Sequence, residues 1–508
     1  MAFADKLIKK AATFSKESKK NKKDAYKSQY KTFKKLIHTA KDTEFGKQYL
    51  FDQILTAKYD LSLFQKLVPI FTYEKIYKEW WKRMKRGDRD TCWPGKIKYF
   101  ALSSGTTNAS SKCIPVSKQM IKSIRKTSMR QMFTMVKFDL PQNTFSNHVL
   151  MIGSSTALEE INGKHFGDMS GISAAHAIPK WFAKQYYKPG YEISNIAEWD
   201  KRIDAIVKNA PNWNVGVICG IPNWVYMVLD KIIEHYKVET IHDIWPNLNL
   251  YIHGGIVFEP YRTAFEKLFN REIGYAETYM ASEGYFAYTA SQKDEGMKLL
   301  LNNSIFYEFI PFNENNFDEE GNLLTLANPI TINKVEEDVD YAIMITNNSG
   351  AWRYLLGDTI KFINAKKATI KITGRTKHYL SDCGEHLSWE NMYAALQKAL
   401  THFEMEAREF TIITVQNKNR YHHKWFIAGK ENTNCRQFAL KLDAQLKLLN
   451  NDYKISRTAN LGTPEVEFLS PKLFYNWMKK EGKMGDQHKI PAVMRGKMKE
   501  SWIRYIHK

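Results

Sequence analysis

Hydroxyl-bearing and small residues surround one glycine between two apolar runs, in the stretch YFALSSGTTNASSKCIPVS at 99–117, and Lys112 closes this turn. Backbone N–H groups freed by such a turn, several hydroxyl groups and one ammonium together suit a polyphosphate. The pattern G-x-x-x-x-G-K-[ST] of the NTPase phosphate loop is absent here. A turn rich in serine and threonine is also typical of an ordinary loop. On its residues alone, the stretch is a candidate phosphate-binding loop of a different kind.

The longer stretch WPGKIKYFALSSGTTNASSKCIPVS, at 93–117, resembles the phosphate loop of the adenylate-forming superfamily. More narrowly, it resembles the plant auxin-responsive acyl acid–amido synthetases of the Gretchen Hagen type and their bacterial relatives. One departure is Asn108, where a glycine commonly follows the Thr-Thr pair; asparagine tolerates left-handed backbone better than most residues. The resemblance gives Lys112 a catalytic role and assigns these residues to ATP: Ser103, Ser104, Gly105, Thr106 and Thr107.

Two further motifs of that family concern the adenine. In YIHGGIVFEPY, at 251–261, a Gly-Gly pair follows an apolar run, and glycines let a flat ring approach the backbone closely. The resemblance implies that Gly254 and Gly255 border adenine, although an ordinary strand-to-helix turn has the same pattern. His253 is interpreted as a packed residue and not as a catalyst. In TYMASEGYF, at 278–286, the resemblance implies that Tyr279 stacks on adenine.

The same TYMASEGYF motif resembles the superfamily's Tyr-Gly-x-Thr-Glu element, with Met280 where a glycine is usual. The resemblance implies that Ser282 bonds the α-phosphate and that Glu283 binds Mg²⁺. This metal prefers hard oxygen ligands shared between carboxylates and phosphates. The alternative is a carboxylate at a strand end with no metal.

Three later motifs complete the family's order. WRYLLGDTIKF, at 352–362, holds Asp358, whose two carboxylate oxygens can accept both ribose hydroxyls. In ITGRTKHYLSDCGEHLSWENM, at 372–392, the resemblance assigns Arg375 to the ribose or phosphate and Lys377 to a hinge between domains. GDQHKIP, at 485–491, resembles the C-terminal element whose lysine, here Lys489, reaches the carboxylate and the α-phosphate.

Composition limits the class of protein. The chain has 508 residues, 44% hydrophobic and 13% aromatic, which is typical of a globular enzyme with two or more domains. Apolar runs are shorter than the ~20 residues of a membrane span, and the first residues lack the apolar core of a signal peptide. Five cysteines without a C-x-x-C pair favour neither a disulfide framework nor a zinc site. A reducing cytoplasm is expected.

The net charge of +21 is concentrated at the chain ends. Residues 1–35 hold twelve lysines and three acidic residues, and residues 471–508 hold ten Lys or Arg and three acidic residues. Such a chain can bind nucleic acid or an anionic membrane surface. We favour a solvated amphipathic helix, because apolar residues recur at helical spacing over 3–14. Anionic substrates are a further reason for a basic chain.

The order of periodic segments predicts the fold. Helices are expected over 25–90, with the last one stopped at Gly87, and strands alternate with helices from 97 to 280, which indicates a largely parallel α/β sheet. From about Ile305, runs including LLTLAN (323–328) indicate an antiparallel or barrel-like subdomain. After Gly374-Arg375, a small α+β unit begins. We therefore expect an α/β protein with a large N-terminal adenylating domain at 1–376 and a small mobile C-terminal domain at 377–508.

Together these motifs predict an acyl acid–amido synthetase that uses ATP and Mg²⁺. It adenylates a small carboxylic acid and transfers the acyl group to an amino acid. A thioester-forming ligase of the acyl-CoA synthetase kind shares the first half-reaction, and a basic nucleic-acid-binding protein is the non-enzymatic alternative. We expect a cytoplasmic monomer with no nucleic acid or membrane partner. The acid, the amine and the base that deprotonates the amine stay open.

Overall fold

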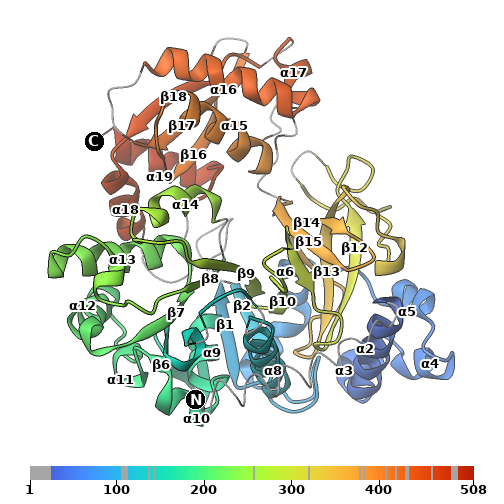
Figure 1. Ribbon diagram of the computed structural model, residues 1–508. Coiled ribbons are helices and arrows are strands. Elements are labelled where there is room, and N and C mark those ends of the chain that lie inside the picture. The colour runs from blue at the N-terminus through green and yellow to red at the C-terminus, as the bar shows by residue number, and fades with distance from the viewer. Residues whose placement is uncertain are drawn as a thin grey trace.

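The computed structural model contains a large unit built on an eleven-stranded sheet and a smaller unit built on a three-stranded sheet, which lies above it in Figure 1. The described residues are 25–103, 112–135, 138–141, 143–255, 258–293, 295–318, 321–376, 380, 385, 387, 389–407, 409–417, 420–429, 434–458, 461–481 and 490–507. The predicted amphipathic helix at 3–14 lies outside them. In the described part of the chain, no helix is long and apolar enough to cross a membrane.

The described residues begin with the helical segment that the sequence predicts over 25–90. Asp60 caps one of its helices by accepting a hydrogen bond from the backbone N–H of Ser62 at 2.8 Å. The segment ends where expected, because Gly87 adopts a φ of +115°, a left-handed conformation that favours glycine. Its elements are α2 (Ala25–Ala40), α3 (Glu44–Gln48), α4 (Phe51–Thr56), α5 (Leu61–Leu67), α6 (Tyr73–Ile76), η1 (Tyr77–Trp81) and α7 (Lys82–Arg86).

Five neighbouring strands make the parallel half of the large sheet, in the spatial order β9-β8-β7-β3-β6. The runs that form them are apolar because helices cover both faces of such a sheet. The strands are β3 (His148–Ile152), β6 (Tyr187–Lys188), β7 (Val215–Gly220), β8 (Leu250–Gly254) and β9 (Gly274–Ala281). The covering helices are α8 (Lys118–Met135), α9 (Met169–His176), α10 (Lys180–Gln185), α11 (Tyr191–Ser194), α12 (Trp199–Asn209), α13 (Pro222–Tyr236) and α14 (Glu259–Glu266).

The antiparallel half continues the same sheet beyond β9, so the strands expected as a barrel-like subdomain do not form a separate sheet. These strands are β10 (Gly284–Tyr288), β11 (Met297–Leu299), β12 (Ile305–Pro311), β13 (Asp340–Asn347), β14 (Tyr354–Asn364) and β15 (Thr369–Arg375). The prediction of a strand for LLTLAN is wrong, because this segment makes only an isolated bridge between Leu323 and Phe317.

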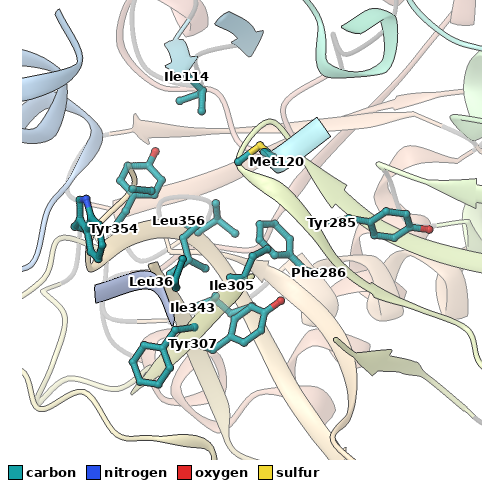
Figure 2. Close-up of a cluster of buried hydrophobic side chains, with 14 of the residues drawn as sticks. Leu36, Ile114, Met120, Tyr285, Phe286, Ile305, Tyr307, Ile343, Tyr354 and Leu356 are labelled. Carbon is teal, nitrogen blue, oxygen red and sulfur yellow. The ribbon is translucent and has the colours of Figure 1, made fainter. Parts of the chain in front are cut away.

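A small second sheet, in the order β2-β1-β5-β4, contains the strands that precede and follow the predicted phosphate loop, whose residues 104–111 lie outside the described residues. Its strands are β1 (Tyr99–Ser103), β2 (Lys112–Val116), β4 (Glu159–Ile161) and β5 (Lys164–Gly167). Because β1 and β2 are antiparallel and Ser103 faces Lys112 across the pair, the loop joins two strands of a hairpin. A hydrophobic core forms where the N-terminal helices pack against the antiparallel strands and this small sheet. Figure 2 shows part of it, including Leu36 of α2 and Ile343 and Leu356 of the antiparallel strands.

The smaller unit has its own core on both faces of its sheet, in the order β16-β17-β18. It contains α15 (Trp389–His402), β16 (Phe410–Asn417), β17 (Arg420–Ala428), α16 (Cys435–Leu449), α17 (Asn451–Ser456), β18 (Glu465–Leu469), α18 (Pro471–Lys480) and α19 (Gly496–Ile506). Helices and strands appear in the predicted order. The domain boundary at 376/377 stays a prediction, because residues 377–379 lie outside the described residues.

Candidate active site

A cavity of about 640 Å³ opens at the carboxyl ends of the parallel strands and is lined by both units. It brings together these predicted residues: Lys112, Gly254, Gly255, Tyr279, Ser282, Glu283, Asp358 and Arg375. Ser103 ends β1 opposite Lys112 and is not among the lining residues. The other predicted residues lie outside the described residues: Ser104, Gly105, Thr106, Thr107, Lys377 and Lys489.

Asp358 is the centre of a hydrogen-bonded group on one wall of the cavity. The hydroxyl of Tyr279 donates to its Oδ2 at 2.7 Å, and Nε of Arg375 lies 2.9 Å from its Oδ1. The pairing of β14 with β15 sets the ion pair, since Asp358 and Arg375 are register partners. Each carboxylate oxygen has a second lone pair, so Asp358 can still accept hydroxyl groups. Arg375 uses Nε for this pair, and its terminal nitrogens suit an anion.

Glu283 provides a buried carboxylate near Lys112. Its side chain accepts a hydrogen bond from the hydroxyl of Tyr354 at 3.3 Å, and its backbone carbonyl accepts one from Asn347 at 2.8 Å. Burial raises the pKa of Glu283, and the Lys112 ammonium opposes that shift. Burial lowers the pKa of Lys112, while Glu283 favours its charged form. The two side chains therefore act on each other across the cavity.

A magnesium ion fits this wall only as a metal shared with the nucleotide. Glu283 is 6% exposed, so its charge needs a cation or a proton. Within the described residues, no group of three or more His, Cys, Asp or Glu could hold a metal. Mg²⁺ bound through one carboxylate, with the remaining ligands from phosphates and water, matches the preference of this ion.

The Gly254-Gly255 turn is shaped by its neighbour strand. A Cβ on Gly254 would lie 2.4 Å from Oγ1 and 2.5 Å from the carbonyl oxygen of Thr278, which no side chain tolerates. Gly255 has a φ of +81°, where glycine is favoured. Gly254 is thus required by the contact between β8 and β9, whatever the cavity binds.

Ser282 lies on the cavity wall with a buried hydroxyl. Its side chain is 3% exposed, and its hydroxyl has no hydrogen-bond partner among the described residues. A buried hydroxyl without a partner is costly, so this position is suited to a ligand atom that reaches it.

Glu277 is a cavity residue that the sequence reasoning missed. It lies two positions before Tyr279 on β9, so strand alternation puts both side chains on one face. Burial, and then Glu259, raise the pKa of Glu277 to about 7, whereas Lys371 lowers it. Its register partner His253 is stacked on Phe258 at 4.5 Å. Because burial lowers the pKa of His253 to about 3, His253 is neutral and packed, as the sequence suggested.

The smaller unit closes one side of the cavity. Tyr261 of α14 donates a hydrogen bond to Oε1 of Glu409 at 2.6 Å, and Lys267 pairs with Glu406 at 2.5 Å. Ile490 and Pro491 line the cavity. They directly follow the GDQHK sequence, so the chain adjoining Lys489 reaches the cavity even though Lys489 is outside the described residues.

Sequence models of one family match the chain at three places. They are the GH3 family N-terminal domain at residues 15–159, the GH3 family central domain at residues 298–375 and the GH3 family C-terminal domain at residues 390–497. Together these matches cover more than half of the chain.

The chain is also similar to individual proteins, in sequence and in structure. The chain is 23% identical to a jasmonoyl-L-amino acid synthetase of Nicotiana attenuata across 67% of each chain. It is 21% identical to one of Oryza sativa subsp. japonica, across 80% of this chain and 81% of that one. A solved GH3.15 acyl acid amido synthetase superposes with a TM-score of 0.76 at 15% identity, covering 95% and 94% of the two chains. A 2-hydroxyisobutyryl-CoA ligase gives 0.59 at 11% identity, covering 94% and 92%. These two structures confirm the fold class, a mixed α/β protein with a large N-terminal and a small C-terminal domain.

Proposed function

Because the chain belongs to the GH3 family, whose three domains it matches in order, we propose that it is an ATP-dependent acyl acid amido synthetase. This is the family that the sequence motifs resemble, so the resemblance is confirmed. The protein is a ligase that forms a carbon–nitrogen bond. The observation that carries the proposal is that Asp358, Glu283 and Lys112 line one cavity.

In the first half-reaction, a carboxylate oxygen of the acid attacks the α-phosphorus of ATP. The bond to the bridging oxygen breaks, pyrophosphate leaves and acyl-AMP remains. Asp358 holds the ribose hydroxyls, and Arg375, fixed by Asp358, directs its terminal nitrogens to the phosphate. Lys112 neutralises charge that develops on the phosphoryl oxygens, a contribution that is large in a cavity with little water. Magnesium bound at Glu283 would supply further positive charge to the phosphates.

In the second half-reaction, the amino group of an amino acid attacks the acyl carbonyl. The amide bond forms, AMP leaves and the amine loses a proton. We propose that the smaller unit rotates about residues 375–377 between the half-reactions and withdraws Lys489. Closure of the cavity protects the acyl-AMP from water.

The proposal includes the setting in which the enzyme works. Its partners are ATP, a small carboxylic acid and an amino acid, and it acts as a monomer. We place it in the cytoplasm, because the cysteines among the described residues are unpaired: Cys92, Cys113, Cys219 and Cys435.

The test is acid-dependent exchange of pyrophosphate into ATP over a panel of carboxylic acids. Acids that give exchange are then incubated with a mixture of amino acids or with coenzyme A, and the products are identified by mass spectrometry. Amides support the proposal, whereas thioesters alone would support the acyl-CoA ligase alternative. Folded protein that gives no exchange with any acid and does not bind ATP would refute both.

A further inference from the structure

One arm of the cavity runs below α8, along one face of the parallel strands. Side chains of a strand alternate between faces, so Val217 and Cys219 of β7 share this face. Their register partners on β3, Val149 and Met151, also line the cavity. We call this arm the acyl arm and define it by these lining residues: Ile124, Arg125, Ser128, Met129, Gln131, Met132, Met135, Phe145, Val149, Met151, Ser170, Ser173, Ala174, Ala177, Ile178, Phe182, Val217, Cys219 and Ile252.

The acyl arm is long. Along β7, lining residues extend from Val217 to Gly220, three extended steps that span about 10 Å at ~3.3 Å per residue. Along α8, they extend from Ile124 to Met135, eleven helical steps that span about 16 Å at ~1.5 Å per residue. Both elements thus give the arm a length of about 10 Å or more. Val217 marks the deep end, and Gly220 lies at the sheet edge near the predicted site.

Most of the residues that line the acyl arm are apolar, and several of them have flexible side chains. Four methionines line it, Met129, Met132, Met135 and Met151, and methionine fills irregular space well. Arg125 is the one charged residue of the arm as defined, and its guanidinium already donates to the carbonyls of Ala177 at 3.1 Å and His176 at 2.6 Å. A second carboxylate at the deep end would therefore be buried without a cation, which is strongly unfavourable.

We propose that the acyl arm receives an elongated, apolar monocarboxylic acid, and that the side chains at 217 and 219 of β7 limit its length. The proposal rests on the proposed function and names its acid. The carboxylate lies at the sheet edge, where Lys112 and Glu283 are, and the chain runs along β7 toward Val217. Cys219 lies two residues nearer the edge than Val217, about 7 Å by strand geometry. A larger side chain at 219 therefore shortens the arm more than one at 217.

Pyrophosphate exchange with each straight-chain acid from butyrate to dodecanoate tests whether residues 217 and 219 limit the length of the acid. In the wild type, kcat/KM is expected to rise about fourfold for each added methylene until the arm is filled, the value of burying one CH₂, and adipate is expected to be poor. Val217→Phe lowers the ratio of decanoate to butyrate activity by at least about tenfold, because two or more methylenes lose their space. Cys219→Phe moves the limit to a still shorter acid, and Val217→Ala moves it to a longer one.

A control variant shows whether a change in length preference comes from the acyl arm. Val238→Phe makes the same substitution at a half-buried position that does not line the cavity, and it is expected to keep the wild-type ratio. A wild type that prefers adipate or compact acids, or the same length profile in all variants, overturns the inference. If no acid gives exchange, the proposed function fails, and calorimetric binding of decanoate decides the inference separately. Binding that Val217→Phe weakens at least about tenfold sustains the arm, and no binding to the wild type refutes it.

Discussion

The carboxyl of Glu277 makes stability depend on pH in a direction opposite to that of most acidic residues. Its pKa is raised from 4.5 to about 7 by burial and by Glu259. Between these values the folded chain holds a proton that the unfolded chain has lost, so the free energy of unfolding falls as pH rises. The stabilisation is present in full below the unfolded value and is lost above about pH 7.

The size of this effect follows from the shift. One pKa unit corresponds to about 1.4 kcal/mol, so a shift from 4.5 to about 7 gives about 3 kcal/mol as an upper bound. The side chain is half-buried, and contact with water reduces the figure. Glu277→Gln keeps the shape and removes the titration. The free energy of unfolding of the variant, relative to that of the wild type, is therefore expected to increase by about 1–3 kcal/mol as the pH rises from 5 to 8.

Urea unfolding of both proteins at four pH values from 5 to 8 measures this gain directly. Every other titrating group is common to the two proteins and cancels in the difference. Glu272→Gln makes the same substitution at an exposed position just before β9 and serves as the matched control. A constant difference for Glu277→Gln would refute the reasoning, because Glu277 would then titrate alike in both states.

Four further substitutions test the site. Glu283→Gln removes the buried charge and should lower the rate of adenylation sharply with the fold intact; normal activity and metal dependence would exclude Glu283 as the metal ligand. Asp358→Asn should raise the KM for ATP by a factor that corresponds to about 1.5–3 kcal/mol, the value of a hydrogen bond to a charged group. An unchanged nucleotide affinity would mean that Gly357-Asp358 is an ordinary turn. Lys489→Ala should slow acyl-AMP formation by on the order of 10²–10³ and spare amide formation from supplied acyl-AMP; equal loss in both steps would contradict rotation of the smaller unit. Gly254→Ala should lower the melting temperature even without ligand, because the added Cβ would lie 2.4 Å from Oγ1 of Thr278. If the variant melts at the same temperature as the wild type, β8 can shift to make room for the Cβ.

The sequence predicted elements whose signal is local. VGVICG is a continuous apolar run, and it forms β7 as Val215–Gly220, because a strand covered on both faces needs apolar side chains throughout. Gly87 stops its helix through its own backbone conformation. Asp358 and Glu283 could be named because the motifs around them resemble those of a known family, and the cavity brings both residues together.

Features that depend on distant partners were not predictable. The strands after Ile305 read as a separate subdomain, because nothing in their sequence shows that β11 pairs with both β10 and β15 and so joins the two halves of one sheet. Among the described residues, the strand expected at LLTLAN makes an isolated bridge and has no neighbour that completes a ladder. The reason for Gly254 is a contact with Thr278, which the sequence places 24 residues away. Glu277 carries no motif of its own, and only its burial beside Glu259 makes it unusual.

The contacts that hold the smaller unit suit a domain that moves. Lys267 and Glu406 are 64% and 49% exposed, and Lys479 and Asp200 are each 68% exposed at 3.6 Å. Exposed ion pairs of this kind contribute about 0–1 kcal/mol each, so breaking both costs little. The buried pair Arg353–Glu308, with exposures of 4% and 1%, lies instead inside the large unit, where its loss would be severe. A buried ion pair thus strengthens the large unit, whereas the exposed ion pairs to the smaller unit are weak, and the hydrogen bond from Tyr261 to Glu409 is the stronger contact that rotation would have to break.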